Sequence, residues 1–193
     1  MSQLKLLHSG GNGVILAPPA SNPAADRTIT LPDAANGEML TTTNPKAGNI
    51  IQVVGYLDPT TGSAGFATTS GSYVTNSVLP SQAITPSKST SKIYVSAFIG
   101  MQNDGGSQIE NTIYRIISGG ATTDLSGNNT YGLVFKGGTN SEWGYSGVQF
   151  VDSPNTTSQV TYTWYGRSEV NGLSVALRHG NSTVGITLME IAA

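Results

Sequence analysis

Two histidines, His8 and His179, are the obvious candidates for acid–base chemistry in this sequence. His8 precedes "SGGNG", and His179 lies in "LRHGNST", where glycine and asparagine predict a turn. A general base needs an orienting partner and a pocket, and the sequence offers neither residue a partner. We therefore expect both histidines to be turn or contact residues rather than catalytic ones.

The carboxylates give no clearer sign of catalysis. Eleven Asp and Glu residues are dispersed along the chain, and no pair stands out by its spacing. A glycosidase needs two carboxyl groups held close together, which a sheet can arrange from distant positions without leaving a sequence pattern. A polysaccharide hydrolase therefore stays open as an alternative. No G-x-S-x-G elbow and no metal-binding histidine pair occurs, so we expect no catalytic residues and no enzyme activity.

Two glycine-rich segments could bind ions. "GGNG" (residues 10–13) lacks the Gly-Lys-Ser/Thr ending of a phosphate loop, and no helical pattern follows it, so it predicts a joint in an arm. "NDGGSQIE" (residues 103–110) lacks the ligand spacing of a calcium loop and instead predicts a hairpin turn at Asp-Gly. The absence of cysteine excludes thiolate-ligated zinc. We expect no metal and no cofactor.

Aromatic residues are the remaining candidates for a binding site. Trp143 and Tyr145 flank a glycine in "SEWGYSG", which is typical of a loop, and exposed aromatics often anchor partners or glycans. For Trp143 the alternative is that it caps the core. Tyr162 and Trp164 alternate with threonines in "QVTYTWYGRSEV" and are expected in the core. Trp143 and Tyr145 are therefore the candidates for contact with a partner.

Composition limits the partners. Charged residues make up 10% of the 193-residue chain, against about 25% in typical soluble proteins, and the formal net charge is −2. The nine Lys and Arg residues form no basic cluster, which argues against nucleic-acid binding. No apolar run approaches the roughly 20 residues that span a bilayer, and the start lacks the apolar core of a secretion signal. We expect neither nucleic acid nor membrane insertion.

The elements that would position these residues are β-strands. "KIYVSAFIG", "NTIYRIISGG" and "QVTYTWYGRSEV" alternate with period two, are rich in β-branched and aromatic residues, and end at Gly, Asn or Asp. Further short runs follow every 10 to 20 residues, which favours a sandwich or jelly roll. The stretch of residues 59–91 predicts a long loop with one or two brief strands. The fold class is therefore all-β.

Two regions are expected. Residues 1–47 form an extended arm with short apolar runs and frequent Pro and Gly, and residues 48–193 form a β-sandwich head. Runs of three or four apolar residues cannot build a core, so the arm is expected to bury them against neighbouring chains. The predicted arm contacts are Leu4, Leu6, Leu7, Val14, Ile15, Leu16, Ile29 and Leu31.

The last run, "GITLMEIAA", is apolar on both faces of a strand. Ile186 and Leu188 would face the core, and the other face would meet another subunit. The predicted subunit-interface residues are Thr187, Met189 and Ile191. An unpaired carboxylate is costly in a dry core, so Glu190 is expected near solvent or hydrogen-bonded where chains meet.

An ordered set of segments resembles a family of bacteriophage virion proteins described as tail-fibre-like or structural. The set comprises "GVILAPPASNPAADRTITLPDAANGEMLTT", "GNIIQVVGYLD", "SKIYVSAFIG", "IYRIISGG", "FVDSPNTTSQVTYTWYGRS" and "STVGITLMEIAA". It covers most of the chain and is weakest between Asp58 and Ser91. The resemblance implies a homotrimer with a head like the tumour-necrosis-factor jelly roll, at a virion surface, made in the cytoplasm of the infected bacterium.

The arm distinguishes two settings. Only about 50 residues precede the expected head, without the heptads or repeats of a fibre shaft. A compact trimer whose arms lie on the surface that carries it needs no shaft. This arrangement suits a capsid decoration, or cement, protein that contacts the major capsid protein. A short tail fibre, spike or fibre tip, bound to tail proteins and to a host-surface glycan, is the alternative. The sequence favours cement.

Overall fold

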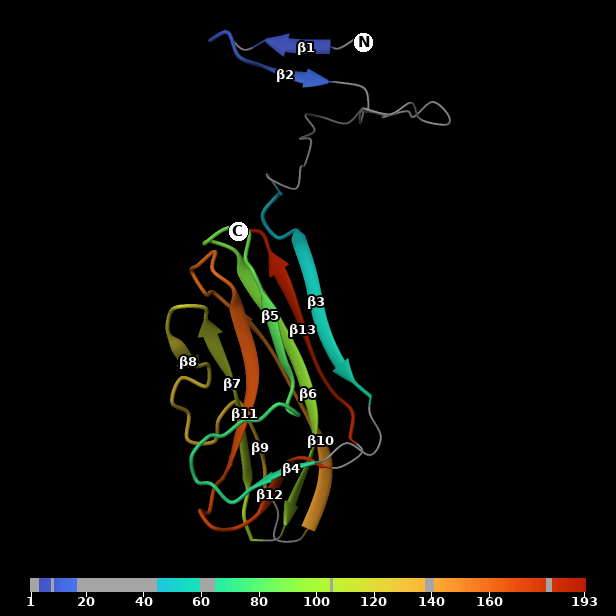
Figure 1. The fold of residues 1–193 in the computed structure, drawn as a ribbon, viewed down its shortest axis with the longest axis vertical. Helices are drawn as coiled ribbons and strands as arrows, with labels where there is room; N and C mark the ends of the chain where they lie inside the picture. The colour runs from blue at the N-terminus through green and yellow to red at the C-terminus, as the bar shows by residue number, and fades with distance from the viewer. Residues whose placement is uncertain are drawn as a thin grey trace. The chain divides into compact units, whose positions relative to one another are not determined.

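The computed structural model describes residues 4–7, 9–16, 45–59, 65–104, 106–137, 141–179 and 182–193. Contacts divide the chain into two units, Met1–Met39 and Leu40–Ala193. Every regular element in the described part of the chain is a strand (Figure 1). No helix among these residues could therefore cross a membrane. The expected all-β class is confirmed.

The first unit contains an antiparallel hairpin of β1 (Leu4–Leu7) and β2 (Gly13–Leu16). Leu4 pairs with Leu16 and Leu7 with Gly13. "GGNG" forms the turn of this hairpin and the first residue of β2, with Gly11 at a φ of +95°, a conformation that glycine adopts without strain. The prediction of a joint at this point is therefore wrong.

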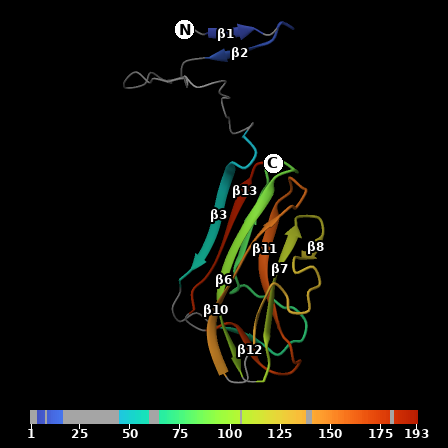
Figure 2. The same ribbon diagram turned by 180° about the vertical axis from the view of Figure 1, so that it is seen from behind.

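The second unit is a sandwich of two antiparallel sheets (Figures 1 and 2). One sheet has six strands: β3 (Ile50–Asp58), β13 (Val184–Ile191), β6 (Lys92–Asp104), β12 (Val175–Arg178), β4 (Phe66–Thr68) and β10 (Ser141–Asp152). The other has five: β5 (Ser81–Ile84), β11 (Val160–Ser168), β7 (Ile109–Ile117), β8 (Thr122–Asp124) and β9 (Val134–Lys136).

Strand order gives the sandwich jelly-roll topology. The full length of β6 pairs with β10 on one side, while β13 and then β12 share its other side. The sheets therefore contain the orders β3–β13–β6–β10 and β5–β11–β7–β8, and the chain crosses repeatedly between them. Eight strands in two sheets with such crossings define a jelly roll. The predicted jelly-roll-like sandwich is confirmed, and the two brief strands expected after residue 59 are β4 and β5.

The core lies between the sheets and follows the period-two pattern. Alternate residues of β6, from Ile93 to Met101, are at most 2% exposed, as are Tyr162 and Trp164 of β11. A buried polar chain crosses this core: the Trp164 Nε1–H donates to Asn111 Oδ1 at 2.9 Å, and the Asn111 amide donates to Met101 Sδ at 3.0 Å. These bonds satisfy the indole and the amide, which otherwise would be costly to bury.

Two local predictions are wrong. The segment after Asp104 makes no hairpin, because β6 and β7 belong to opposite sheets and this segment crosses between them. "SEWGYSG" is no loop either: it lies in β10, where Trp143 pairs with Gln102 and Tyr145 with Gly100. Its Gly and Ser residues do not favour a strand by themselves, but pairing with β6 from Ile93 to Asp104 stabilises the strand.

The position predicted for Glu190 is also wrong. Its side chain is 0% exposed and accepts hydrogen bonds from Ser87 N (2.7 Å), Ser87 Oγ (2.6 Å) and Gln52 Nε2 (2.6 Å). Burial alone would raise the pKa of Glu190, but the hydrogen bonds from Ser87 and Gln52 outweigh burial and lower it. The carboxylate is therefore paired inside its own chain, and the prediction of a solvent or interchain position is wrong.

Candidate functional site

The outward-facing side of β3, β13, β6 and β10 is the first candidate site. Strand register fixes which side chains share this side, because paired residues in an antiparallel sheet point the same way. We call it the outer face; its positions are Ile50, Val53, Gly55, Leu57, Lys92, Tyr94, Ser96, Phe98, Gly100, Gln102, Trp143, Tyr145, Gly147, Gln149, Val151, Gly185, Thr187, Met189 and Ile191. Lys92, at one end, is the single charged residue among them.

Apolar side chains of the outer face are exposed. Leu57 is 61% exposed, Val53 55%, Val151 53% and Phe98 38%. An antiparallel sheet with one wet side normally alternates apolar and polar residues, and this one carries apolar residues on both sides. Large exposed apolar patches mark interaction sites. The outer face therefore has the chemistry of a surface that is covered in the working assembly.

The predicted subunit-interface residues lie on this outer face. Thr187, Met189 and Ile191 point outward from β13 and are half-buried by their neighbours on β3 and β6. The sequence reasoning missed Val53, Leu57 and Phe98 beside them. A sequence pattern could have identified them, because "IIQVVGYLD" and "YVSAFIG" carry apolar residues at both odd and even positions, and therefore on both faces of a strand.

The second sheet has a different outward side, covered by its own chain. Tyr73 packs edge-on against Tyr114 with ring centroids 6.3 Å apart, and the Arg167 guanidinium lies 4.7 Å from the centre of the Tyr73 ring. Arg167 Nε donates to Glu110 Oε2 at 2.5 Å. Burial raises the pKa of Tyr73 to about 12, with the Arg167 charge opposing the shift. This cluster stabilises the segment around Tyr73, which covers this side of the second sheet.

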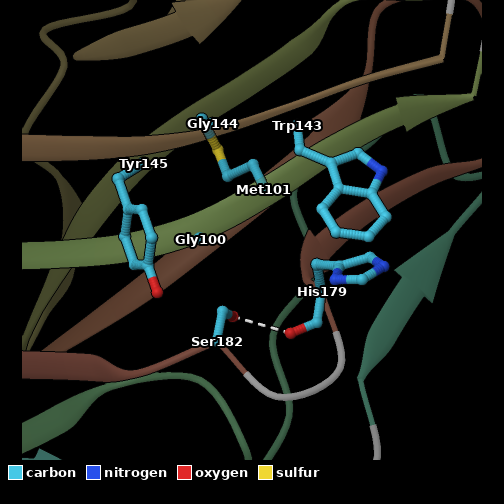
Figure 3. A pocket seen from close by; sticks show the side chains of 7 residues that line it. All are labelled: Gly100, Met101, Trp143, Gly144, Tyr145, His179 and Ser182. Carbon is cyan, nitrogen blue, oxygen red and sulfur yellow. Dashed lines mark hydrogen bonds between the residues drawn. The ribbon is translucent and has the colours of Figure 1, made fainter.

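A pocket of about 360 Å³ opens at the end of the outer face where β10 begins. Its lining residues come from β6, β10 and the segment after β12: Gly100, Met101, Trp143, Gly144, Tyr145, His179 and Ser182 (Figure 3). The chain enters the head at the other end of the sheet, where Gly48 N donates to Ala192 O at 2.8 Å. We call this site the aromatic pocket.

Two aromatic walls define the aromatic pocket. The Trp143 and His179 rings lie over one another with centroids 4.2 Å apart and an interplanar angle of 34°, and Tyr145 stands on the opposite side (Figure 3). Trp143 is 68% exposed and Tyr145 66%. Both predicted partner-contact residues are therefore brought together, and the alternative that Trp143 caps the core is wrong.

The floor of the aromatic pocket depends on a glycine. A Cβ added at Gly100 would overlap the Ser182 side chain and lie 3.4 Å from Tyr145 Cε1. The backbone holds the walls in place: His179 N donates to Gly100 O at 3.0 Å, and Ser182 Oγ donates to the His179 carbonyl at 2.6 Å. His179 was expected as a turn or contact residue, and no sequence pattern predicts that it stacks on Trp143.

The predicted arm contacts divide between described and undescribed residues. Leu4, Leu6 and Leu7 lie in β1, and Val14, Ile15 and Leu16 lie in β2. Leu7 is 67% exposed, Leu6 57% and Ile15 50%. Ile29, Leu31 and His8 lie outside the described residues.

The residues that line the aromatic pocket limit its chemistry. The lining of the aromatic pocket has no Asp, Glu, Lys or Arg. Within the described ranges, no three His, Asp or Glu residues gather where they could hold a metal ion. The chemistry available in the pocket is that of aromatic faces, an imidazole, a phenol and a hydroxyl, which suits binding.

Comparisons with known proteins add little to this geometry. No protein-family model matches the chain, and no curated protein matches it. Two solved structures of infectious bursal disease virus, of the Gx and Gt strains, are similar at 11% and 12% sequence identity with TM-scores of 0.32 and 0.33. The matches cover 93% and 94% of this chain, which spans about half the length of those chains. Similarity at this level carries no argument about function.

Proposed function

We propose that this chain is a non-enzymatic structural protein of a bacteriophage virion, a homotrimer that decorates and stabilises the capsid as a cement protein. The observation that carries the proposal is the outer face, which is apolar, exposed and nearly free of charge. The resemblance of the segments quoted above to phage virion proteins supplies the setting. The protein would be made in the cytoplasm of the infected bacterium and act at the virion surface.

A second copy of the chain is the partner that suits the apolar part of the outer face around Val53, Leu57 and Phe98, which leaves the end with Trp143 and Tyr145 open. Each large apolar side chain fully removed from water contributes roughly 1.5–3 kcal/mol before ordering costs. Because the outer face has a charge only at Lys92, copies can meet there without like-charge repulsion over its centre. Most soluble oligomers close by rotational symmetry, and a trimer is one such arrangement.

The hairpin of β1 and β2 supports an attachment role for the arm. A two-stranded hairpin is marginally stable by itself in water, and this one exposes Leu6, Leu7 and Ile15. Burial of these residues against the major capsid protein would stabilise both surfaces. Three arms on one trimer would add avidity because they bind at a high effective concentration.

The aromatic pocket favours a second candidate, a short tail fibre, spike or fibre tip that binds tail proteins at one end and the host surface at the other. The pocket lies at the end of the head opposite Gly48, where the chain enters it. A receptor site there would leave the Gly48 end of the head free for tail proteins.

Copy number per virion separates the two candidates. Quantitative mass spectrometry of purified virions should find this protein in large copy number on empty capsids, and capsids stripped of it should melt at a lower temperature. A few copies that remain with isolated tails would contradict the cement proposal and support the fibre.

Self-association has its own test. Leu57→Glu places a charge at a residue that is 61% exposed in the single chain, so the head should fold normally. We expect sedimentation to show a trimer for the wild type and a monomer for the variant, because a charge buried in an apolar interface is costly. Phe135→Glu, at a 55% exposed position of β9 outside the outer face, is the matched control and should stay trimeric. A monomeric wild type would contradict the proposal.

A further inference from the structure

The aromatic pocket supports an inference that does not depend on whether the protein sits on a capsid or a tail. We propose that the pocket binds one ring of a neutral carbohydrate, stacked between Trp143 and Tyr145. Nothing in the cement function requires exposed aromatics here, and each is about two thirds exposed. The ligand class follows from the spacing, the polar groups and the charge of the lining.

The separation of the two aromatic side chains suits a single ring. Trp143 and Tyr145 are two residues apart on one strand and point the same way, which separates them by about 7 Å along β10. Gly144 lies between them with its backbone turned the other way, and Gly100 beneath has no side chain. The two aromatic groups therefore stand apart over a floor of small residues, Gly100 and Ser182, and the pocket is open between them.

The aromatic faces select the chemistry of the ligand. Aromatic rings carry partial negative charge on their faces, so they attract the weakly positive C–H groups on one side of a pyranose. His179 stacks on Trp143 with centroids 4.2 Å apart, which limits the positions open to the indole. Because the indole is already held in place before the ligand binds, less side-chain entropy is lost on binding.

Polar groups at the edge can meet the hydroxyls of a sugar. The Tyr145 hydroxyl and the His179 imidazole border the pocket, and the Ser182 hydroxyl, which donates to the His179 carbonyl, can still accept a hydrogen bond (Figure 3). A few polar groups among apolar walls are typical of small-molecule sites. The lining has no charged side chain, so the ligand is neutral rather than a uronic or sialic acid.

Tryptophan fluorescence of the full-length protein tests the proposal. Trp143 is 68% exposed and Trp164 is 1% exposed, so quenching or a blue shift on binding reports Trp143. The probes are glucose, galactose, mannose, N-acetylglucosamine and a trisaccharide of each, with glucuronic and sialic acids as charged counterparts. We expect at least one neutral probe to bind with a dissociation constant in about the millimolar range.

Variants assign that binding to the pocket. Trp143→Ala and Tyr145→Ala, read by saturation-transfer NMR, should each weaken binding at least about tenfold, and Trp143→Phe should fall between wild type and Trp143→Ala. Tyr131→Ala is the matched control, because Tyr131 is 49% exposed and packs on Phe135 instead, with centroids 5.3 Å apart. The control should bind as the wild type does.

Four results would overturn the proposal: no neutral probe changes the fluorescence up to about 50 mM; Trp143→Ala binds as tightly as wild type; the control loses binding to the same degree; or only the acidic sugars bind. Sedimentation of Trp143→Ala is measured in parallel. A change from trimer to monomer without loss of sugar binding would assign Trp143 to self-association and overturn its role here. Sugar binding and trimer formation can each fail alone, so the two proposals are judged separately.

Discussion

Replacement of Glu190 by glutamine tests the account of the head's stability. Glu190 is 0% exposed, and its carboxylate accepts from Ser87 N, Ser87 Oγ and Gln52 Nε2 at 2.6 to 2.7 Å. Glutamine has nearly the same shape and can still accept from Ser87 through its one carbonyl oxygen. Its amide nitrogen, however, would face the Gln52 amide, so two donors would meet without an acceptor.

The structure allows an estimate of the cost. One buried donor left unsatisfied costs about 1–3 kcal/mol, and hydrogen bonds to a charged acceptor are worth more than those to a neutral one. We therefore expect Glu190→Gln to lower the free energy of unfolding by about 2–4 kcal/mol at pH 7.

The loss should depend on pH. The folded-state pKa of Glu190 lies below its unfolded value of 4.5, so the folded protein favours the ionised form. Its contribution to stability is complete above the unfolded pKa and disappears as the pH falls through the folded pKa. The difference between wild type and Glu190→Gln should therefore shrink on acidification from about pH 5 downward.

Denaturant unfolding at several pH values, at fixed protein concentration, measures both effects. Glu142→Gln is the matched control, since Glu142 is half exposed and pairs with Lys136 at the surface; it should change stability by less than about 1 kcal/mol. A Glu190→Gln variant as stable as wild type at pH 7 would show that these hydrogen bonds do not stabilise the head. A large loss that stays constant on acidification would contradict the pH dependence expected from the lowered pKa.

Two further predictions concern the core and the arm. Gly166→Ala should lower the unfolding free energy by about 1–3 kcal/mol and shift Trp164 emission, because the added methyl would overlap Leu177 and lie 2.8 Å from Asn111 Oδ1. Gly137→Ala, whose nearest contact would be Gln108 at 3.5 Å, is the control and should be neutral, and equal losses would contradict the packing argument. Deletion of residues 2–31 should leave the melting temperature of the head unchanged while incorporation into virions is lost, as judged by blotting of purified particles. Normal incorporation of that truncated protein would contradict the attachment role of the arm.

Much of the fold could be predicted because strand periodicity is local. Residues of β6 and β11 alternate, and alternation gives most of the buried set; Gly100 and Thr163 are buried out of phase with it. Pairing between strands was harder. The Asp-Gly step after β6 suits a hairpin, yet β7 joins the opposite sheet, and only the packing of the two sheets decides between these outcomes. Local sequence patterns do not show that β6 pairs with β10 and β13, which lie far from it along the chain.

The candidate site was predicted only in part. Trp143 and Tyr145 could be identified by residue type and spacing, since two aromatics around a glycine are unusual in a polar segment. The stacking of His179 could not, because it depends on β12 ending beside β10 across β6. Glu190 was misjudged for a similar reason: its donors Ser87 and Gln52 lie more than 100 residues away in the chain.

The position of β13 has a consequence for biosynthesis. This strand is the last of the described strands to leave the ribosome, yet it lies between β3 and β6 in the middle of its sheet. Until it emerges, β3 has no partner in that sheet and one edge of β6 stays open. The head should therefore gain its stability late, after its other strands have been synthesised, and nascent chains should be prone to pair with one another through the open edge. Shortening the chain before Val184 should accordingly yield insoluble protein rather than a smaller folded head.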